Sequence, residues 1–134
     1  MKVTWIGQAG LLFEGTQLKV LVDPYLSDAC GEKNPKSHRR IPVDPTFLDC
    51  KPDVIVLTHD HLDHTDPDTL CHYLGENTEV CVLASGNAWD NVRKRFGGIK
   101  NNYVTFNAGT EWTEKGVHFK AVYANHSDNC AIAF

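Results

Sequence analysis

The first 22 residues contain three short stretches whose apolar and polar positions are typical of β-strands. Residues 2–6 are typical of a strand, with apolar Val3 and Trp5 between polar neighbours. Two further β-type runs, residues 11–13 and 18–22, flank a turn at residues 15 and 16. The chain is therefore predicted to begin as an antiparallel meander.

Five later stretches also predict strands. Residues 53–58 and 80–84 are continuous apolar runs rich in β-branched side chains, which indicates strands buried on both faces. Residues 103–106, 111–114 and 117–124 are separated by turn-forming Asn, Gly and Lys residues, which predicts a return to antiparallel structure.

Two helices are predicted between these strands. Asp66 is a good N-cap, followed by proline at the first helical position, and this helix should end at residue 73 or 74, before Gly75. Ser85 is expected to cap a second helix over residues 87–96. The alternation of strands and helices predicts a mixed α/β fold in a single domain, residues 1–134.

Residues 24–52 lack clean periodicity and contain five of the six prolines. A loop of this length is either functional or a mobile surface insertion. It includes a basic run over residues 36–40, which is either a solvated surface or a contact for an anionic substrate. At the other end, residues 131–134 are apolar and strand-like, which suggests a piece of a longer protein.

Charge and cysteine content narrow the class of protein. The 134 residues include 13 basic and 17 acidic side chains, a net charge of −4, which disfavours a nucleic-acid or membrane-surface binder. No apolar run approaches the ~20 residues of a membrane span. The five cysteines form no C-x-x-C pair, and the N-terminus does not resemble a signal peptide, so a cytoplasmic protein with reduced thiols is expected.

The segment Thr58-His-Asp-His-Leu-Asp-His64 carries the strongest chemical signal. It follows the predicted buried strand 53–58, and imidazole and carboxylate groups are the ligands that zinc and similar divalent ions prefer. Four such groups are too dense for one tetrahedral ion. The first two histidines can point at one ion and the following Asp-His pair at a second, which predicts a centre for two divalent ions.

This H-x-H-x-D-H segment resembles the signature of the metallo-β-lactamase superfamily. The surrounding sequence is similar to the ascorbate-6-phosphate-lactonase-like branch of metal-dependent hydrolases, in stretches that include WIGQAGLLFEG, LVDPYLS and ANHSD. This similarity covers essentially the whole chain. The resemblance implies the N-terminal half of an αββα sandwich, truncated after the third histidine motif. The bridging aspartate and last histidine of complete members have no counterpart here.

The resemblance also implies roles for individual residues. The ligands of the first ion would be His59, His61 and His126, and those of the second ion would be Asp63 and His64. Asp23 resembles the aspartate that supports the histidine loop from behind the ligands, although a simple turn-forming role before Pro24 fits the sequence equally well. The other three histidines, His38, His72 and His118, are not expected to bind the metal.

The implied activity is hydrolysis of a lactone, ester or phosphoester, with a metal-bound hydroxide as nucleophile and zinc or manganese as the metal. Asp63 would be a ligand and could also orient the attacking water or accept its proton. The substrate would be a small molecule, possibly anionic. Two alternatives remain: a catalytically inactive half-fold that binds a partner or forms a homodimer through exposed apolar surface, and a nucleic-acid-processing member of the superfamily, which the charge disfavours.

Overall fold

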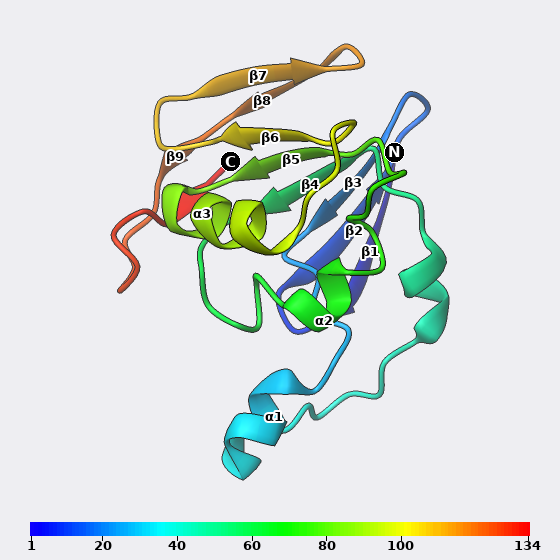
Figure 1. Cartoon of the computed structure of the whole chain (residues 1–134), viewed down its shortest axis with the longest axis vertical. Helices are drawn as coiled ribbons and strands as arrows, with labels where there is room; N and C mark the ends of the chain where they lie inside the picture. The colour runs from blue at the N-terminus through cyan, green and yellow to red at the C-terminus, as the bar shows by residue number, and fades with distance from the viewer.

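Six strands form one mixed sheet, in which each strand pairs with its sequence neighbours (Figure 1). The computed structural model describes residues 1–134. The strands are β1 (Lys2–Gly7), β2 (Gly10–Glu14), β3 (Lys19–Val22), β4 (Val54–Leu57), β5 (Cys81–Ala84) and β6 (Asn102–Thr105). The pairings β1–β2 and β2–β3 are antiparallel, as the meander predicts, and the pairings from β3 to β6 are parallel.

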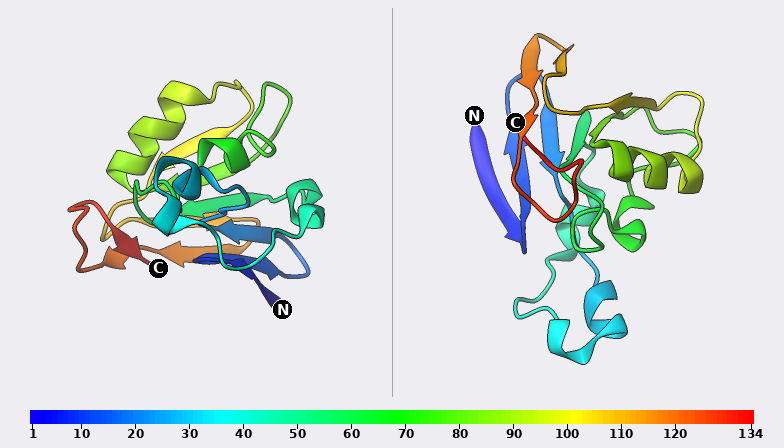
Figure 2. Two further views of the ribbon diagram at one scale, coloured as in Figure 1. Left: turned by 90° about the horizontal axis from the view of Figure 1, so that it is seen from below. Right: turned by 90° about the vertical axis from the view of Figure 1, so that its left-hand side faces the viewer.

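Helices cover one face of this sheet, and shorter strands cover the other (Figure 2). The first face carries α2 (Pro67–Leu70) and α3 (Gly86–Arg95). The second carries β7 (Glu111–Glu114) paired with β8 (Val117–Lys120), and β9 (Val122–Tyr123) paired with β10 (Ile132–Ala133). The predicted mixed α/β fold is confirmed.

The buried strands supply both cores because successive side chains point to opposite faces. In β4, Ile55 and Leu57 pack in the core under the helices, while Val54 and Val56 pack in the core under the strands. All four side chains are fully buried, which explains why this stretch shows no polar alternation.

The long segment between β3 and β4 contains three short helices that periodicity did not indicate. They are α1 (Ala29–Lys33) and the 3-10 helices η1 (Pro35–Ser37) and η2 (Pro45–Asp49). Each has at most five residues, too few for a recognisable 3.6-residue pattern. The segment is tied to the body where the Leu26 amide donates to the Thr69 hydroxyl oxygen at 2.7 Å.

The helix after the histidine segment is shorter than predicted. Asp66 does cap it, accepting from the amides of Asp68 and Thr69, but α2 ends at Leu70 rather than at residue 73 or 74. Beyond Leu70 the bonding is mixed: the Leu70 carbonyl accepts from the Tyr73 amide (i→i+3) and from the Leu74 amide (i→i+4).

Two further sequence expectations are wrong in detail. Ser85 precedes α3, but its hydroxyl is buried without a hydrogen-bond partner, so it does not cap the helix through its side chain. The predicted strand 117–124 is divided at Ala121 into β8 and β9, although the Ala121 amide still donates to the Thr110 carbonyl in the register of the β7–β8 pair. No helix in the structure is long and apolar enough to cross a membrane.

Candidate metal centre

The sheet topology brings the candidate residues together at the carboxyl ends of three strands that point in the same direction. Strands β3 and β4 are parallel neighbours, with Val22 opposite Val56, so the residues that follow them emerge side by side. Asp23 follows β3, and the histidine segment follows β4. Strand β1, two antiparallel steps from β3, ends at the same edge and is followed by Gln8. Polar groups from three strand ends therefore meet in one place.

Two clusters of potential ligands share His59. The first consists of His59, His61 and His126, with ring centroids 4.2 to 4.8 Å apart. The second consists of Asp23, His59 and His64. In each cluster, one nitrogen or carboxylate oxygen per residue lies within 4.8 Å of the others. The third histidine, 62 residues beyond His64, thus lies beside the histidine segment, as the resemblance implied.

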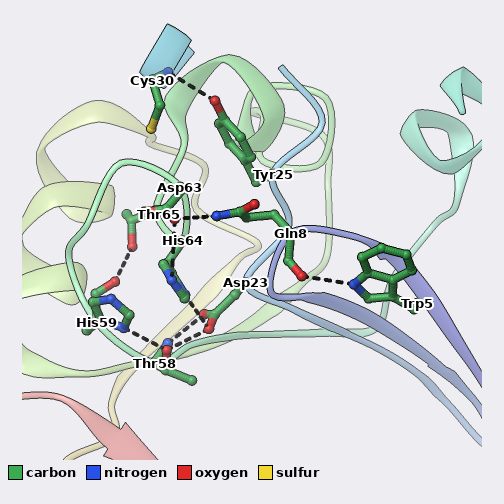
Figure 3. A network of polar contacts seen from close by, with 10 residues as sticks. All are labelled: Trp5, Gln8, Asp23, Tyr25, Cys30, Thr58, His59, Asp63, His64 and Thr65. Carbon is green, nitrogen blue, oxygen red and sulfur yellow. Dashed lines mark hydrogen bonds and ion pairs between the residues drawn. The ribbon is translucent and has the colours of Figure 1, made fainter. Parts of the chain in front are cut away.

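His59 presents a free ring nitrogen to these neighbours. Its side chain is 6% exposed, and Nε2 is buried with no hydrogen-bond partner. The other ring nitrogen, Nδ1, lies 3.0 Å from the hydroxyl of Thr58, and that hydroxyl lies 2.6 Å from an Asp23 carboxylate oxygen (Figure 3). Because a carboxylate can only accept, the hydroxyl donates to Asp23 and accepts from His59 Nδ1.

This relay fixes the tautomer of His59. With its proton on Nδ1, the neutral ring keeps a lone pair on Nε2, the form that a metal ion binds. Burial, together with the neighbouring His64 and His126, lowers the pKa of His59 to about 4, so the ring is neutral at physiological pH. A buried nitrogen without a hydrogen-bond partner destabilises the folded chain, and a metal ion would give its lone pair a partner.

Asp23 holds the segment from behind. It is 3% exposed and accepts from the Thr58 amide at 2.8 Å and from His64 Nδ1 at 2.8 Å. Its φ is +41°, a left-handed conformation that aspartate tolerates better than most residues. Burial alone would lower the pKa of His64, but the hydrogen bond and charge of Asp23 outweigh it and hold that pKa above its usual value. Asp23 therefore supports the loop from a bend at the end of β3.

Asp63 lies on the outer side of the cluster. One of its carboxylate oxygens lies 3.8 Å from His64 Nε2, the nitrogen that Asp23 leaves free. The same oxygen accepts from the Gln8 side-chain amide at 3.0 Å, and Trp5 Nε1 donates to the Gln8 carbonyl. Sequence reasoning missed Gln8. Its position could have identified it. Gln8 follows the first predicted strand, and in an antiparallel meander the first and third strands end at the same side of the sheet, where Asp23 lies.

His126 is exposed, and Asp128 orders the turn that carries it. Asp128 accepts from the amide of Asp60, which joins this turn to the histidine segment, and its own amide donates to His126 Nδ1 at 3.1 Å. In the neutral ring that bond leaves the proton on Nε2, so binding an ion through His126 requires a rearrangement of the ring's hydrogen bonds. Sequence reasoning did not identify this positioning role of Asp128.

The other three histidines lie outside both clusters. His38 pairs with Asp28, and His118 pairs with Glu111 on β8 and β7. His72 is exposed just after α2. Their exclusion from the predicted ligand set agrees with these positions.

The residues present fit a divalent ion. Imidazole and carboxylate groups dominate the cluster, and the unpartnered Nε2 of His59 faces three other imidazole rings. An ion bound there would act as a Lewis acid, polarising a carbonyl or phosphoryl group and activating water near neutral pH. The protein supplies the fixed His59 tautomer, the Asp23 support and the Asp63 carboxylate held by Gln8.

Replacing Thr58 with valine is expected to weaken zinc binding about 10- to 100-fold, because His59 loses the group that fixes its tautomer. Replacing Thr58 with serine keeps the hydroxyl and should retain most of the affinity. Competition with a chromophoric chelator measures both variants against the unchanged chain. Equal affinity of the valine and serine variants would contradict the relay from Asp23 through Thr58 to His59.

The structure thus combines a mixed α/β sheet with a histidine cluster, beyond its parallel strand ends, that could hold a divalent ion. The chain belongs to the beta-lactamase superfamily, because residues 2–131 match the family model described as "Beta-lactamase superfamily domain". A UPF0173 metal-dependent hydrolase of Methanosarcina mazei is 42% identical over 134 residues, a match that covers 96% of this chain and 48% of that protein.

Solved structures agree on the fold. A putative metal-dependent hydrolase from Parabacteroides distasonis superposes with a TM-score of 0.65 at 20% identity, covering 97% of this chain and 52% of that one. The metallo-beta-lactamase SMB-1, in complex with mercaptoacetic acid, gives a TM-score of 0.56 at 20% identity, covering 97% of this chain and 53% of that one. The chain therefore spans about half the length of these proteins.

Proposed function

We propose that this chain forms the metal-binding part of a hydrolase that cleaves a lactone, ester or phosphoester. The observation that carries the proposal is the buried, unpartnered Nε2 of His59 among three other imidazole rings. The 42% identity to a metal-dependent hydrolase supports it. The flanking sequence similarity favours the ascorbate-6-phosphate-lactonase-like branch, with residues 1–134 as a single domain.

The proposed ligands divide between two ions, either zinc or manganese. His59, His61 and His126 would hold the first, and Asp63 and His64 the second, with Asp23 behind them. Histidine and carboxylate shells accept several divalent metals, so both zinc and manganese suit this set. The five cysteines are all free, which supports a reducing, cytoplasmic setting.

Asp63 is the proposed catalytic carboxylate. It lies at the open side of the cluster, where Gln8 holds one of its oxygens. A carboxylate in that position can orient an attacking water and accept its proton, a contribution of about 10²- to 10⁴-fold in rate. The substrate binds as a small molecule in front of this carboxylate.

The test is a turnover assay of the chain with zinc, with manganese and after chelation, against a γ-lactone, a p-nitrophenyl ester and bis-p-nitrophenyl phosphate. Metal-dependent turnover of at least one substrate is expected. Asp63→Asn should lower kcat at least 100-fold, whereas Asp68→Asn, an exposed aspartate without a side-chain hydrogen bond, should leave kcat unchanged. Equal rates with and without metal would contradict the proposal.

Exposed apolar side chains favour a second candidate, an inactive module that forms a homodimer. Val3 and Trp5 on edge strand β1 are 51% and 56% exposed, and Tyr123 on β9 is 71% exposed. Such surface on an edge strand favours pairing with another chain. Light scattering separates the two candidates: a metal-loaded, catalytically active monomer contradicts this one.

A further inference from the structure

A cavity of about 600 Å³ lies beside the candidate metal centre and has no role in the arrangement of the proposed ligands. The segment around η1 lines one side of it, and Trp5 and Gln8 at the end of β1 line another. Asp63 forms part of its wall as well as part of the histidine cluster. The cavity therefore opens directly onto the proposed catalytic carboxylate.

Three cations line this cavity without carboxylate partners. Lys36, Arg39 and Arg40 all contribute to its wall, and no side-chain nitrogen of the three lies within 4.0 Å of an acidic oxygen. The backbone amide of Arg39, by contrast, donates to Asp28 at 2.9 Å. The nearby His38 is different, because it is paired with Asp28. In a chain with a net charge of −4, this is a local excess of positive charge at a concave surface.

Arg39 is held in a fixed position. Its Nη1 donates to the Tyr25 carbonyl, its Nε donates to the Ile41 carbonyl at 3.3 Å, and the guanidinium carbon lies 5.1 Å from the centre of the Tyr25 ring. Gly7 makes room for it, because a Cβ there would lie 2.5 Å from Nη2. These two bonds use two of the five guanidinium hydrogens, which leaves three for a ligand.

We propose that this basic cavity binds the anionic group of the substrate, a phosphate or a carboxylate. The inference rests on the proposed function and adds the charge of the substrate and the residues that recognise it. A fixed guanidinium matches the oxygen geometry of phosphate and carboxylate, and the flexible Lys36 and Arg40 add charge around it. With the anionic group held there, the rest of the molecule reaches Asp63, which borders both the cavity and the cluster.

The test uses the metal-free 134-residue chain, so that an anion cannot bind through a metal ion. Inorganic phosphate and acetate are titrated separately by isothermal calorimetry, into the unchanged chain and into the double variant Lys36→Gln/Arg40→Gln. Both side chains are exposed, and Arg39, which ties the segment to Tyr25, is left in place. The control is Lys33→Gln/Lys51→Gln, which removes the same charge from two exposed lysines outside the cavity.

At least one of the two anions is expected to bind, and the double variant should weaken that binding at least tenfold while the control variant changes it less than twofold. Preference for phosphate or for acetate identifies which anionic group the substrate carries. Absence of binding by both anions, or equal weakening in the control, overturns the proposal. Zinc affinity is measured on the same variants and should not change, so loss of the anion site is distinguishable from loss of the metal centre.

Discussion

Replacing His59 and His61 together with alanine is expected to abolish stoichiometric metal uptake by this chain. The double variant removes two of the three proposed ligands of the first ion, and it also removes His59 from the cluster with Asp23 and His64. Asp63 and His64, the proposed ligands of the second ion, remain, but two ligands are too few to hold an ion by themselves. The remaining His126 already spends one ring nitrogen on the Asp128 amide and cannot hold an ion alone. Elemental analysis of the size-exclusion peak should fall from near one equivalent of zinc or manganese, or more, to background.

The matched control for this double variant is His72→Ala/His118→Ala. It also removes two histidines, and both of these side chains are exposed and lie outside the clusters. Its metal content should equal that of the unchanged chain. Unchanged stoichiometry in the His59/His61 variant, or an equal loss in the control, would mean that the metal is bound elsewhere.

Replacing Asp23 with asparagine is expected to lower the free energy of unfolding by about 1–3 kcal/mol, the cost of leaving at least one partly buried donor without an acceptor. One carboxylate oxygen of Asp23 accepts from the Thr58 hydroxyl and His64 Nδ1, and the other accepts from the Thr58 amide. An asparagine has only one accepting oxygen, so in either orientation its amide nitrogen faces at least one of these donors. Asparagine tolerates the positive φ of this position as well as aspartate does, so the variant isolates the lost hydrogen bonds from backbone strain.

Urea unfolding of the metal-free chain measures this loss, with Asp68→Asn as the control for removing a negative charge at an exposed site. The control should change stability by no more than about 0.5 kcal/mol. Zinc affinity of Asp23→Asn should also fall about 10- to 100-fold, because a neutral amide supports the Thr58 hydroxyl and the His59 tautomer less strongly than the carboxylate does. A stable Asp23→Asn variant with unchanged zinc affinity would show that Asp23 only forms the turn before Pro24.

The pattern of apolar and polar residues identified most of the strands, because the burial of a strand determines which of its positions are apolar. The uninterrupted apolar run at Val54–Leu57 predicts a strand buried on both faces, and the structure buries all four side chains. The histidine segment after it was identified from composition and spacing alone. Both features are local, so they can be recognised without knowing where distant residues lie.

The periodicity of apolar residues predicted the structure less well where a few backbone hydrogen bonds decide the conformation. Helix α2 ends at Leu70, where i→i+3 bonds begin to mix with i→i+4 bonds, and no side-chain pattern marks that change. The three short helices between β3 and β4 are likewise too brief to produce a periodic signal. Residues that looked like an irregular loop thus form one wall of the basic cavity.

By itself, the sequence indicated the mixed α/β class and the candidate ligands of the histidine segment, because strand patterns and metal-binding residue types are local properties. His126 became a candidate only through the family resemblance. Only the tertiary structure decided which groups support those ligands. The Thr58 hydroxyl links Asp23 to His59, Gln8 holds Asp63 from 55 residues away, and the Asp128 carboxylate binds the Asp60 amide. These contacts depend on the order and direction of the strands, which place separate chain segments at one edge of the sheet.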